Sequence, residues 1–308
     1  MLVGGLLAQN IYDGIYGASH PSSTLVALPS SAVEWVWSGG LTESGGVVNA
    51  KVERVDRGVR LAVSTDRDLS DTSWFDPVSV DGHVVRFEPD GLRASTHYHY
   101  AVEVGGVLDT VRAGGFETFP AGPESFTIAI GSCARVGSEG AVFDAIRELD
   151  PLLFLITGDF HYSNIGDDDI EAFRAVLDHT LTRTPQAALY RSTPIAYVWD
   201  DHDYGANNAD STSPSRPAAM QAYREYVPHY SLLGRESPIA QAFTIGRVRV
   251  IMTDTRSARS PAGDADGDAK TMLGAEQRAW FERELLAADD EYPLILWVNS
   301  VPWIAAPA

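Results

Sequence analysis

The sequence predicts an α/β protein in which a β-sandwich precedes a larger domain of alternating strands and helices. From residue 32 to about residue 104, short segments of alternating apolar and polar residues are separated by glycine-rich turns, as in immunoglobulin- or fibronectin-like sandwiches. Prolines and glycine at Phe119-Pro120-Ala121-Gly122-Pro123 then interrupt regular structure. Beyond that point apolar strands alternate with amphipathic helices, which predicts a largely parallel sheet covered by helices.

These patterns divide the chain into three parts. We expect a glycine- and serine-rich arm over residues 1–31, a sandwich over 32–119 and the α/β domain over 124–308. The length of 308 residues suits two domains, and a hydrophobic content of 44% allows a sizeable core.

Within the sandwich, Val33, Trp35 and Trp37 alternate with Glu34 and Val36, and two later segments continue the pattern at 59–63 and 97–104. We expect His97 and His99 to face solvent rather than to bind a ligand. In the second domain, helices are predicted over 139–149, 168–181 and 271–286, with a further one that begins near Pro217. Gln277 interrupts the apolar face of the 271–286 helix.

The net charge, the cysteine count and the apolar runs limit the possible partners, disulfides and membrane segments of the chain. The formal net charge of −19 argues against a nucleic-acid backbone as the main partner, because phosphate neutralisation needs a basic surface. The single cysteine, Cys133, excludes an intrachain disulfide. No apolar run is long enough for a transmembrane helix, and no Lys or Arg precedes Lys51, so no standard signal peptide is visible and export stays open.

Five apolar strands of the second domain each end in polar side chains, which predicts one site built at their carboxyl ends. The five endings are Gly131-Ser132-Cys133, Gly158-Asp159-Phe160-His161-Tyr162, Asp200-Asp201-His202-Asp203, Thr253-Asp254-Thr255-Arg256 and Asn299-Ser300. Thiolate, imidazole and phenolate suit a transition metal, whereas carboxylate and amide oxygens suit a hard cation. Asp159 is placed to bridge two such ions.

Each of these residues also has an ordinary structural interpretation. Cys133 alone would be a buried small hydrophobe, and Tyr162 an aromatic at the rim of the site. His202 would bond a neighbouring aspartate on a surface loop. Arg256 suits a phosphate group but equally suits a salt bridge to the local carboxylates.

The strand endings resemble those of a known family. Gly-Ser-Cys-Ala, Gly-Asp-Phe-His-Tyr, Trp-Asp-Asp-His-Asp-Tyr-Gly-Ala-Asn-Asn, Thr-Asp-Thr-Arg-Ser and Val-Asn-Ser-Val-Pro-Trp are similar to motifs of the alkaline phosphatase D (PhoD-like) family of calcineurin-like metallophosphoesterases. The resemblance covers about residue 32 to the end. It implies that the second domain is a metallophosphatase αββα sandwich and that the protein acts outside the cytoplasm, in an extracellular or periplasmic setting.

The resemblance also implies a binuclear metal centre. Cys133, Asp159 and Tyr162 would hold Fe3+, and Asp159 would bridge to a second metal, typically Ca2+, although other divalent metals remain open. Asp201 and, by a weaker match, Asn299 would bind the second metal. His202 would stabilise or protonate the leaving group.

One departure from the family pattern concerns the C-terminal end. The family has a later Gly-Asp-x-His motif, which this sequence lacks before it ends at Ala308. We therefore expect a C-terminally truncated member whose phosphatase domain is incomplete and which hydrolyses phosphate esters poorly.

The leading functional hypothesis is a phosphomonoesterase or phosphodiesterase in which a metal-bound hydroxide attacks phosphorus. Arg256 would help to hold the charged oxygens. The rival hypothesis is a non-catalytic surface or binding protein with a degenerate phosphatase domain. Metal content discriminates between the two.

Overall fold

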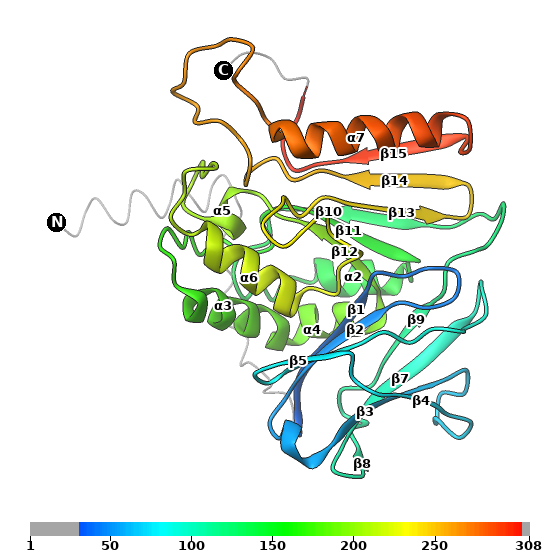
Figure 1. Cartoon of the computed structure of the whole chain (residues 1–308). Coiled ribbons are helices and arrows are strands. Elements are labelled where there is room, and N and C mark those ends of the chain that lie inside the picture. The colour runs from blue at the N-terminus through cyan, green and yellow to red at the C-terminus, as the bar shows by residue number, and fades with distance from the viewer. Residues whose placement is uncertain (1–30, 304–308) are drawn as a thin grey trace.

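The computed structural model describes residues 31–303 and contains three β-sheets (Figure 1). The predicted N-terminal arm therefore lies almost entirely outside the described residues. A seven-stranded sheet has the order β10 (Ile128–Gly131), β11 (Leu153–Thr157), β12 (Ile195–Val198), β1 (Val33–Gly39), β2 (Val47–Val52), β6 (Val84–Phe87) and β5 (Ser79–Asp81). Strands β10, β11 and β12 are mutually parallel, as the strand–helix alternation predicted.

The second sheet completes the N-terminal β-sandwich. Its order is β4 (Ser73–Phe75), β3 (Val59–Ser64), β7 (His97–Val104) and β8 (Val107–Leu108), and β9 (Gly114–Glu117) also pairs with β7. The apolar positions of the alternating segments, such as Val33, Leu61 and Val63, are buried, and the polar position Arg60 is exposed. Val36 and Ala62 on the opposite faces are buried as well, so β1 and β3 are covered on both sides over much of their length and the alternation does not mark a single inward face.

The sandwich shares its core with the rest of the chain. Strand β1 runs parallel to β12, with Gly39 opposite Ile195. Trp37 donates its indole N–H to the carbonyl of Tyr226 at 2.8 Å, and its ring lies 5.7 Å from that of Phe160. The proline-rich segment therefore separates two sequence patterns but does not separate two independent cores.

The third sheet comprises β13 (Gln241–Ile245), β14 (Val248–Met252) and β15 (Leu294–Val298). Strands β14 and β15 are parallel, and α7 (Gly274–Asp289) covers their outer face (Figure 1). This sheet lies against β10–β12, which carry the remaining helices on their other side. The result is the αββα layering that the resemblance implies.

Helices lie close to their predicted positions. The short η1 (Val55–Arg57) belongs to the sandwich, and the α/β part has α2 (Val142–Glu148), α3 (Ile170–Thr182), α4 (Thr184–Ser192), α5 (Asp201–Tyr204) and α6 (Arg216–Tyr226). Helix α3 begins after Asp169, whose carboxylate accepts hydrogen bonds from the N–H groups of Glu171 and Ala172. Helices α4 and α5 were not predicted, because α4 follows α3 directly and α5 is a single turn.

The apolar face expected for α7 is interrupted by a buried amide. Gln277 is fully buried, and it donates to and accepts from the backbone of Asp254 at 2.7 Å in each direction. The break in the sequence pattern therefore marks where α7 is bonded to the end of β14.

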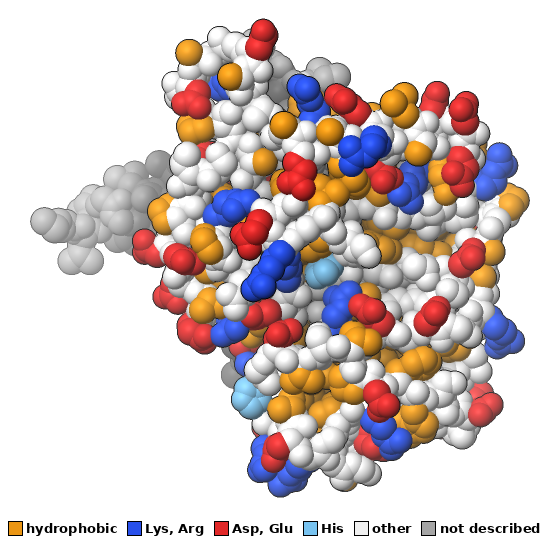
Figure 2. All heavy atoms as spheres, viewed as in Figure 1, with side chains coloured by type: hydrophobic (Ala, Val, Ile, Leu, Met, Phe, Trp, Pro, Cys, Tyr) orange, Lys and Arg blue, Asp and Glu red, His pale blue; other side chains and the backbone are white. Residues whose placement is uncertain are grey.

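The distribution of surface charge and the length of the helices concern the predictions about nucleic-acid binding and transmembrane segments. Acidic and basic side chains are interspersed over the face drawn in Figure 2. Among residues 31–303, no helix combines the length and apolar character that crossing a membrane requires.

Candidate metal centre

Three parallel strands of the seven-stranded sheet bring the polar residues that follow them together at their carboxyl ends. Gly131 lies opposite Ile156, and Thr157 lies opposite Val198, so β10, β11 and β12 end almost level with one another. The residues that follow each strand consequently meet in space, although more than 60 residues separate the first from the last.

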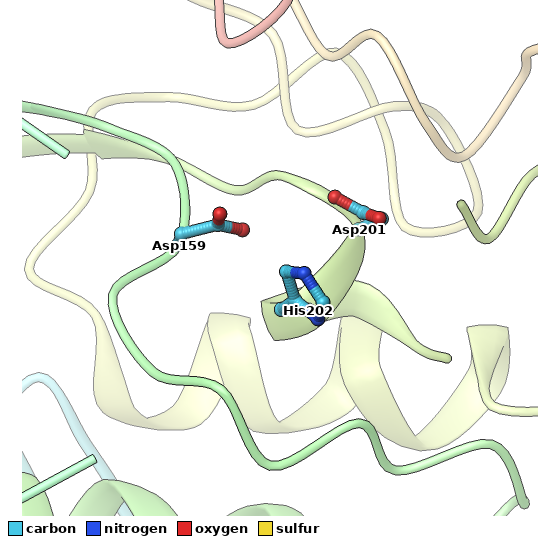
Figure 3. Close-up of side chains that lie close together, drawn as sticks. All are labelled: Asp159, Asp201 and His202. Atoms are coloured by element: carbon cyan, nitrogen blue, oxygen red, sulfur yellow. The ribbon is translucent and has the colours of Figure 1, made fainter. Parts of the chain in front are cut away.

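Asp159, Asp201 and His202 form the centre of this group (Figure 3). Each offers one ligand atom, and these atoms all lie within 4.8 Å of one another. Asp159 is in the loop after β11, and its carboxylate points toward the short helix α5 that carries Asp201 and His202. Both carboxylates are buried, with 7% exposure for Asp159 and 5% for Asp201.

Cys133 and Asp159 share an unusual backbone geometry. Their φ angles are +61° and +53°, which are uncommon for residues other than glycine. Hydrogen bonds from Cys133 N to Gly158 O (3.2 Å) and from Ala134 N to Asp159 O (2.8 Å) hold the two loops together. The Cys133 Sγ atom consequently lies 3.6 Å from Oδ2 of Asp159. Such local strain persists only where surrounding contacts enforce it, and it is concentrated at functional sites.

The second carboxylate oxygen of Asp159 is unpartnered within residues 31–303. Oδ1 of Asp159 is buried and has no hydrogen-bond partner among the described residues. An ionised carboxylate oxygen in that position is costly unless a cation or a donor offsets it. The neighbouring thiol, carboxylate and imidazole are metal ligands, so the residues present fit a bound metal.

Tyr162 lies at the rim and contacts this group. Burial, together with hydrogen bonding to Asp159 and Cys133, raises the pKa of its phenol well above the ordinary value. Its ring centroid is 4.3 Å from that of His202, and the side chain is 37% exposed. The phenol is therefore directed at Asp159 while one face of the ring lies against the imidazole.

His202 has a defined orientation through a residue that the sequence did not indicate. Its Nδ1 lies 2.6 Å from Oδ1 of Asn164, which is an acceptor, so Nδ1 carries the proton. The Asn164 amide in turn donates to the carbonyl of Tyr162 at 3.3 Å. Nε2 of His202 is left as the nitrogen with a free lone pair.

Asp201 is kept ionised by its neighbours. Burial acts to raise its pKa, but the Asn208 N–H and the Arg256 guanidinium outweigh it, and the net pKa is lowered. The Asn208 N–H donates to Oδ2, and Nη2 of Arg256 lies 3.3 Å from Oδ1.

Arg256 is engaged with carboxylates through Nε and Nη2, whereas its buried Nη1 has no hydrogen-bond partner among the described residues. It is 5% exposed, and its Nε donates to Asp200, whose oxygen also accepts from Ser300 at 2.8 Å. Burial raises the pKa of Asp200. The structure shows the salt bridges to Asp200 and Asp201, and the unpartnered Nη1 is compatible with the phosphate contact that the sequence also suggested.

Asn299 does not join the central group by any hydrogen bond. It is half-buried after β15, and its side chain makes no hydrogen bond with another described residue. Its neighbour Ser300 is the one that contacts Asp200, and it also lies 2.8 Å from the hydroxyl of Thr255.

Two further buried aspartates bond to groups that neighbour the candidate ligands. Asp203 accepts hydrogen bonds from the backbone N–H groups of His161 and Asp200 at 3.1 and 3.0 Å, and burial raises its pKa to about 8. Asp254 accepts from the Trp199 indole at 2.8 Å and from the Arg256 N–H at 2.9 Å. Asp254 belongs to one of the polar strand endings, but the sequence indicated no role for it.

The profile of the PhoD-like phosphatase family matches residues 128–302, which are more than half of the chain. The chain belongs to the PhoD-like phosphatase family. This confirms the resemblance found in the strand-end motifs, and the matched region contains every residue of the candidate metal centre.

Solved structures give the same fold for this PhoD-like chain. A structure of PhoD superposes with a TM-score of 0.71 and 20% identity, covering 90% of this chain and 63% of that one. The purple acid phosphatase PPD1 from yellow lupin (Lupinus luteus) superposes with a TM-score of 0.59 and 12% identity, covering 85% and 49%. At these identities the likeness shows the fold.

Curated relatives are longer than this chain. An uncharacterized protein of Mycobacterium tuberculosis, known from strains CDC 1551 / Oshkosh and H37Rv, is 27% identical over 249 residues, which are 74% of this chain and 43% of the relative. The chain thus spans less than half the length of these relatives.

Proposed function

We propose that the protein is a metal-dependent phosphoric ester hydrolase with a binuclear metal centre. The observation that carries the proposal is the buried, unpartnered Oδ1 of Asp159 beside Asp201, His202 and Cys133. Family membership and the fold of the phosphatase neighbours support the same reaction class.

The donor set favours two different ions. Cys133, Asp159 and Tyr162 would hold a transition metal such as Fe3+, because thiolate and phenolate are soft or strongly basic ligands. Asp201, with Asn299, would bind a harder ion such as Ca2+ through oxygens. Asp159 would be shared by both ions. When bound, the pair supplies Lewis-acid charge and a nucleophilic water near neutral pH.

The chain's own residues would then orient the ester and handle the proton. His202, with Nδ1 held by Asn164 and its ring against Tyr162, would present Nε2 to the oxygen of the departing alcohol and, in its doubly protonated form, would transfer the Nε2 proton to that oxygen. Arg256 would hold Asp201 ionised and in place, and its unpartnered Nη1 would help to hold the charged oxygens of the phosphate group.

The proposed substrate is a phosphate ester, either a monoester or a diester. By family resemblance, the proposed location is extracellular or periplasmic.

The proposal is tested by metal analysis together with hydrolysis of para-nitrophenyl phosphate and its bis ester. We expect two metal ions per chain after reconstitution with iron and calcium, and release of nitrophenol that His202→Ala reduces. Two bound metals without turnover of either ester would favour a binding protein instead. Absence of bound metal would refute the proposed centre.

A further inference from the structure

Two histidines face the same side of β7 at a distance from the candidate metal centre. His97 and His99 are two residues apart, so the strand directs both side chains to one face. Their ring centroids are 4.7 Å apart at an interplanar angle of 65°. Neither imidazole makes a hydrogen bond with another residue of the described part of the chain.

A glycine in the neighbouring strand makes room for this pair. Gly115 of β9 lies opposite His99 in the antiparallel ladder. A Cβ atom added at Gly115 would lie 3.1 Å from Nε2 of His97. The His97 ring therefore leans over the position left open by Gly115, which is toward His99. A larger residue at position 115 would push the two rings apart.

The pair lines a cavity of about 510 Å3 between the sandwich and the α/β part. Residues from both parts contribute to the lining, which includes Asp68 from the loop before β4 and Asp150 from the turn after α2. The charged groups around the cavity are these two carboxylates and the Arg67 guanidinium, so its acidic groups outnumber its basic one.

We propose that His97 and His99 together bind a divalent transition metal ion of the Zn2+, Ni2+ or Cu2+ class, at a site separate from that of Asp159. Imidazole pairs prefer these ions, whereas Ca2+ and Mg2+ require oxygen ligands. Within residues 31–303, three carboxylate, imidazole or thiol donors converge only at Asp159, Asp201 and His202, so water completes the coordination here. Asp68 and Asp150 give the lining of this cavity a net negative charge, which favours a bound cation.

The site is tested with Cu2+, which reports its ligands by electron paramagnetic resonance. The wild type is expected to show hyperfine coupling to two nitrogens, and His97→Ala and His99→Ala to lose it. In each single variant only one imidazole remains to bind Cu2+ instead of two. We therefore expect the Cu2+ affinity of this site, measured by calorimetry, to fall about 10²-fold or more. His83→Ala is the matched control, since His83 is also in the sandwich but bonds the Val52 carbonyl.

A second variant separates ligand loss from misfolding. Gly115→Ala keeps both histidines but crowds the His97 ring, and we expect weaker Cu2+ binding with an unchanged circular dichroism spectrum. Two-nitrogen coupling in a His97→Ala/His99→Ala double variant, or affinities equal to wild type in both single variants, would overturn the proposal. Iron and calcium content at the Asp159 centre is expected to stay the same throughout, so the outcome is independent of the proposed hydrolase activity.

Discussion

Arg256, which follows β14, lies 3.3 Å from the carboxylate of Asp201, which follows β12. The same guanidinium donates to Asp200, so one cation links the ends of two different sheets. All three side chains are largely buried. The site is thus assembled across the interface between the two sheets of the αββα sandwich.

Arg256→Ala is expected to destabilise the metal-free protein by about 3–5 kcal/mol, because it leaves two buried carboxylates without their counter-ion. Urea unfolding of metal-free protein measures the loss. Arg54→Ala is the control, since the Arg54–Asp56 pair is on the surface, and no measurable change is expected. An Arg256→Ala protein as stable as wild type would show that the pair contributes nothing to the interface.

Asp159→Ala is expected to remove at least one metal and to abolish phosphate ester hydrolysis. The carboxylate would be shared by both ions, so its loss leaves two cations close together without a common anion. Asp203→Ala is expected to reduce metal affinity by about 10–100-fold without eliminating binding, because Asp203 contacts the backbone N–H groups of Asp200 and His161 rather than a metal. Inductively coupled plasma mass spectrometry measures the metal content. Equal metal occupancy in Asp159→Ala and wild type would eliminate the bridging role.

Gln277→Leu is expected to cost about 2–5 kcal/mol, since it leaves the buried N–H and carbonyl of Asp254 unpaired. The change keeps side-chain volume similar, so packing contributes little. Thermal and urea unfolding measure the effect. Gln221→Leu on α6 is the control, because Gln221 is exposed and bonds Glu225 on the surface. If the Gln277→Leu and Gln221→Leu proteins have the same free energy of unfolding, the contact between α7 and the backbone of Asp254 does not contribute to stability.

Acid is expected to destabilise the protein through His229. Burial, together with the nearby Arg86, lowers its pKa from 6.5 to about 4. Below pH 6.5 the unfolded chain takes up a proton that the folded chain does not, so stability is full above about pH 6.5 and is lost as the pH falls toward 4.

The full loss from this residue is on the order of 3 kcal/mol. His229→Gln is expected to reduce the slope of unfolding free energy against pH between those limits. Part of the slope remains in this variant, because burial also lowers the pKa of His161 to about 4, and the protein therefore loses stability in acid through His161 as well. Unfolding free energies measured by urea titration at several pH values test this, and an unchanged slope in His229→Gln would contradict it.

Several features of the fold follow from local sequence. The alternation of Val33, Trp35 and Trp37 predicts a strand with a buried face, because side chains of a strand point alternately to opposite sides. The apolar run over 153–157 followed by Gly158-Asp159 predicts a strand that ends in a functional loop. These signals involve neighbouring residues only, so no tertiary information is needed to find them.

The motifs at the strand ends also determined the family, and with it the layering of the second part of the chain. That result depends on the order of five short motifs, which the sequence contains directly. It extends to the candidate ligands Cys133, Asp159, Tyr162 and Asp201, because each lies within a motif. Their assignment as ligands remains a prediction.

Tertiary structure alone decided how these groups contact one another. The engagement of Arg256 with Asp200 and Asp201, the orientation of His202 by Asn164, and the bond between Gln277 and Asp254 all join segments that are far apart in the chain. The pairing of β1 with β12, which gives the sandwich and the α/β part a common core, is of the same kind. The periodicity of a sequence indicates which face of a helix or strand is apolar. A hydrogen bond or salt bridge between distant elements depends on how those elements pack. The local sequence pattern therefore gives no signal for such a bond.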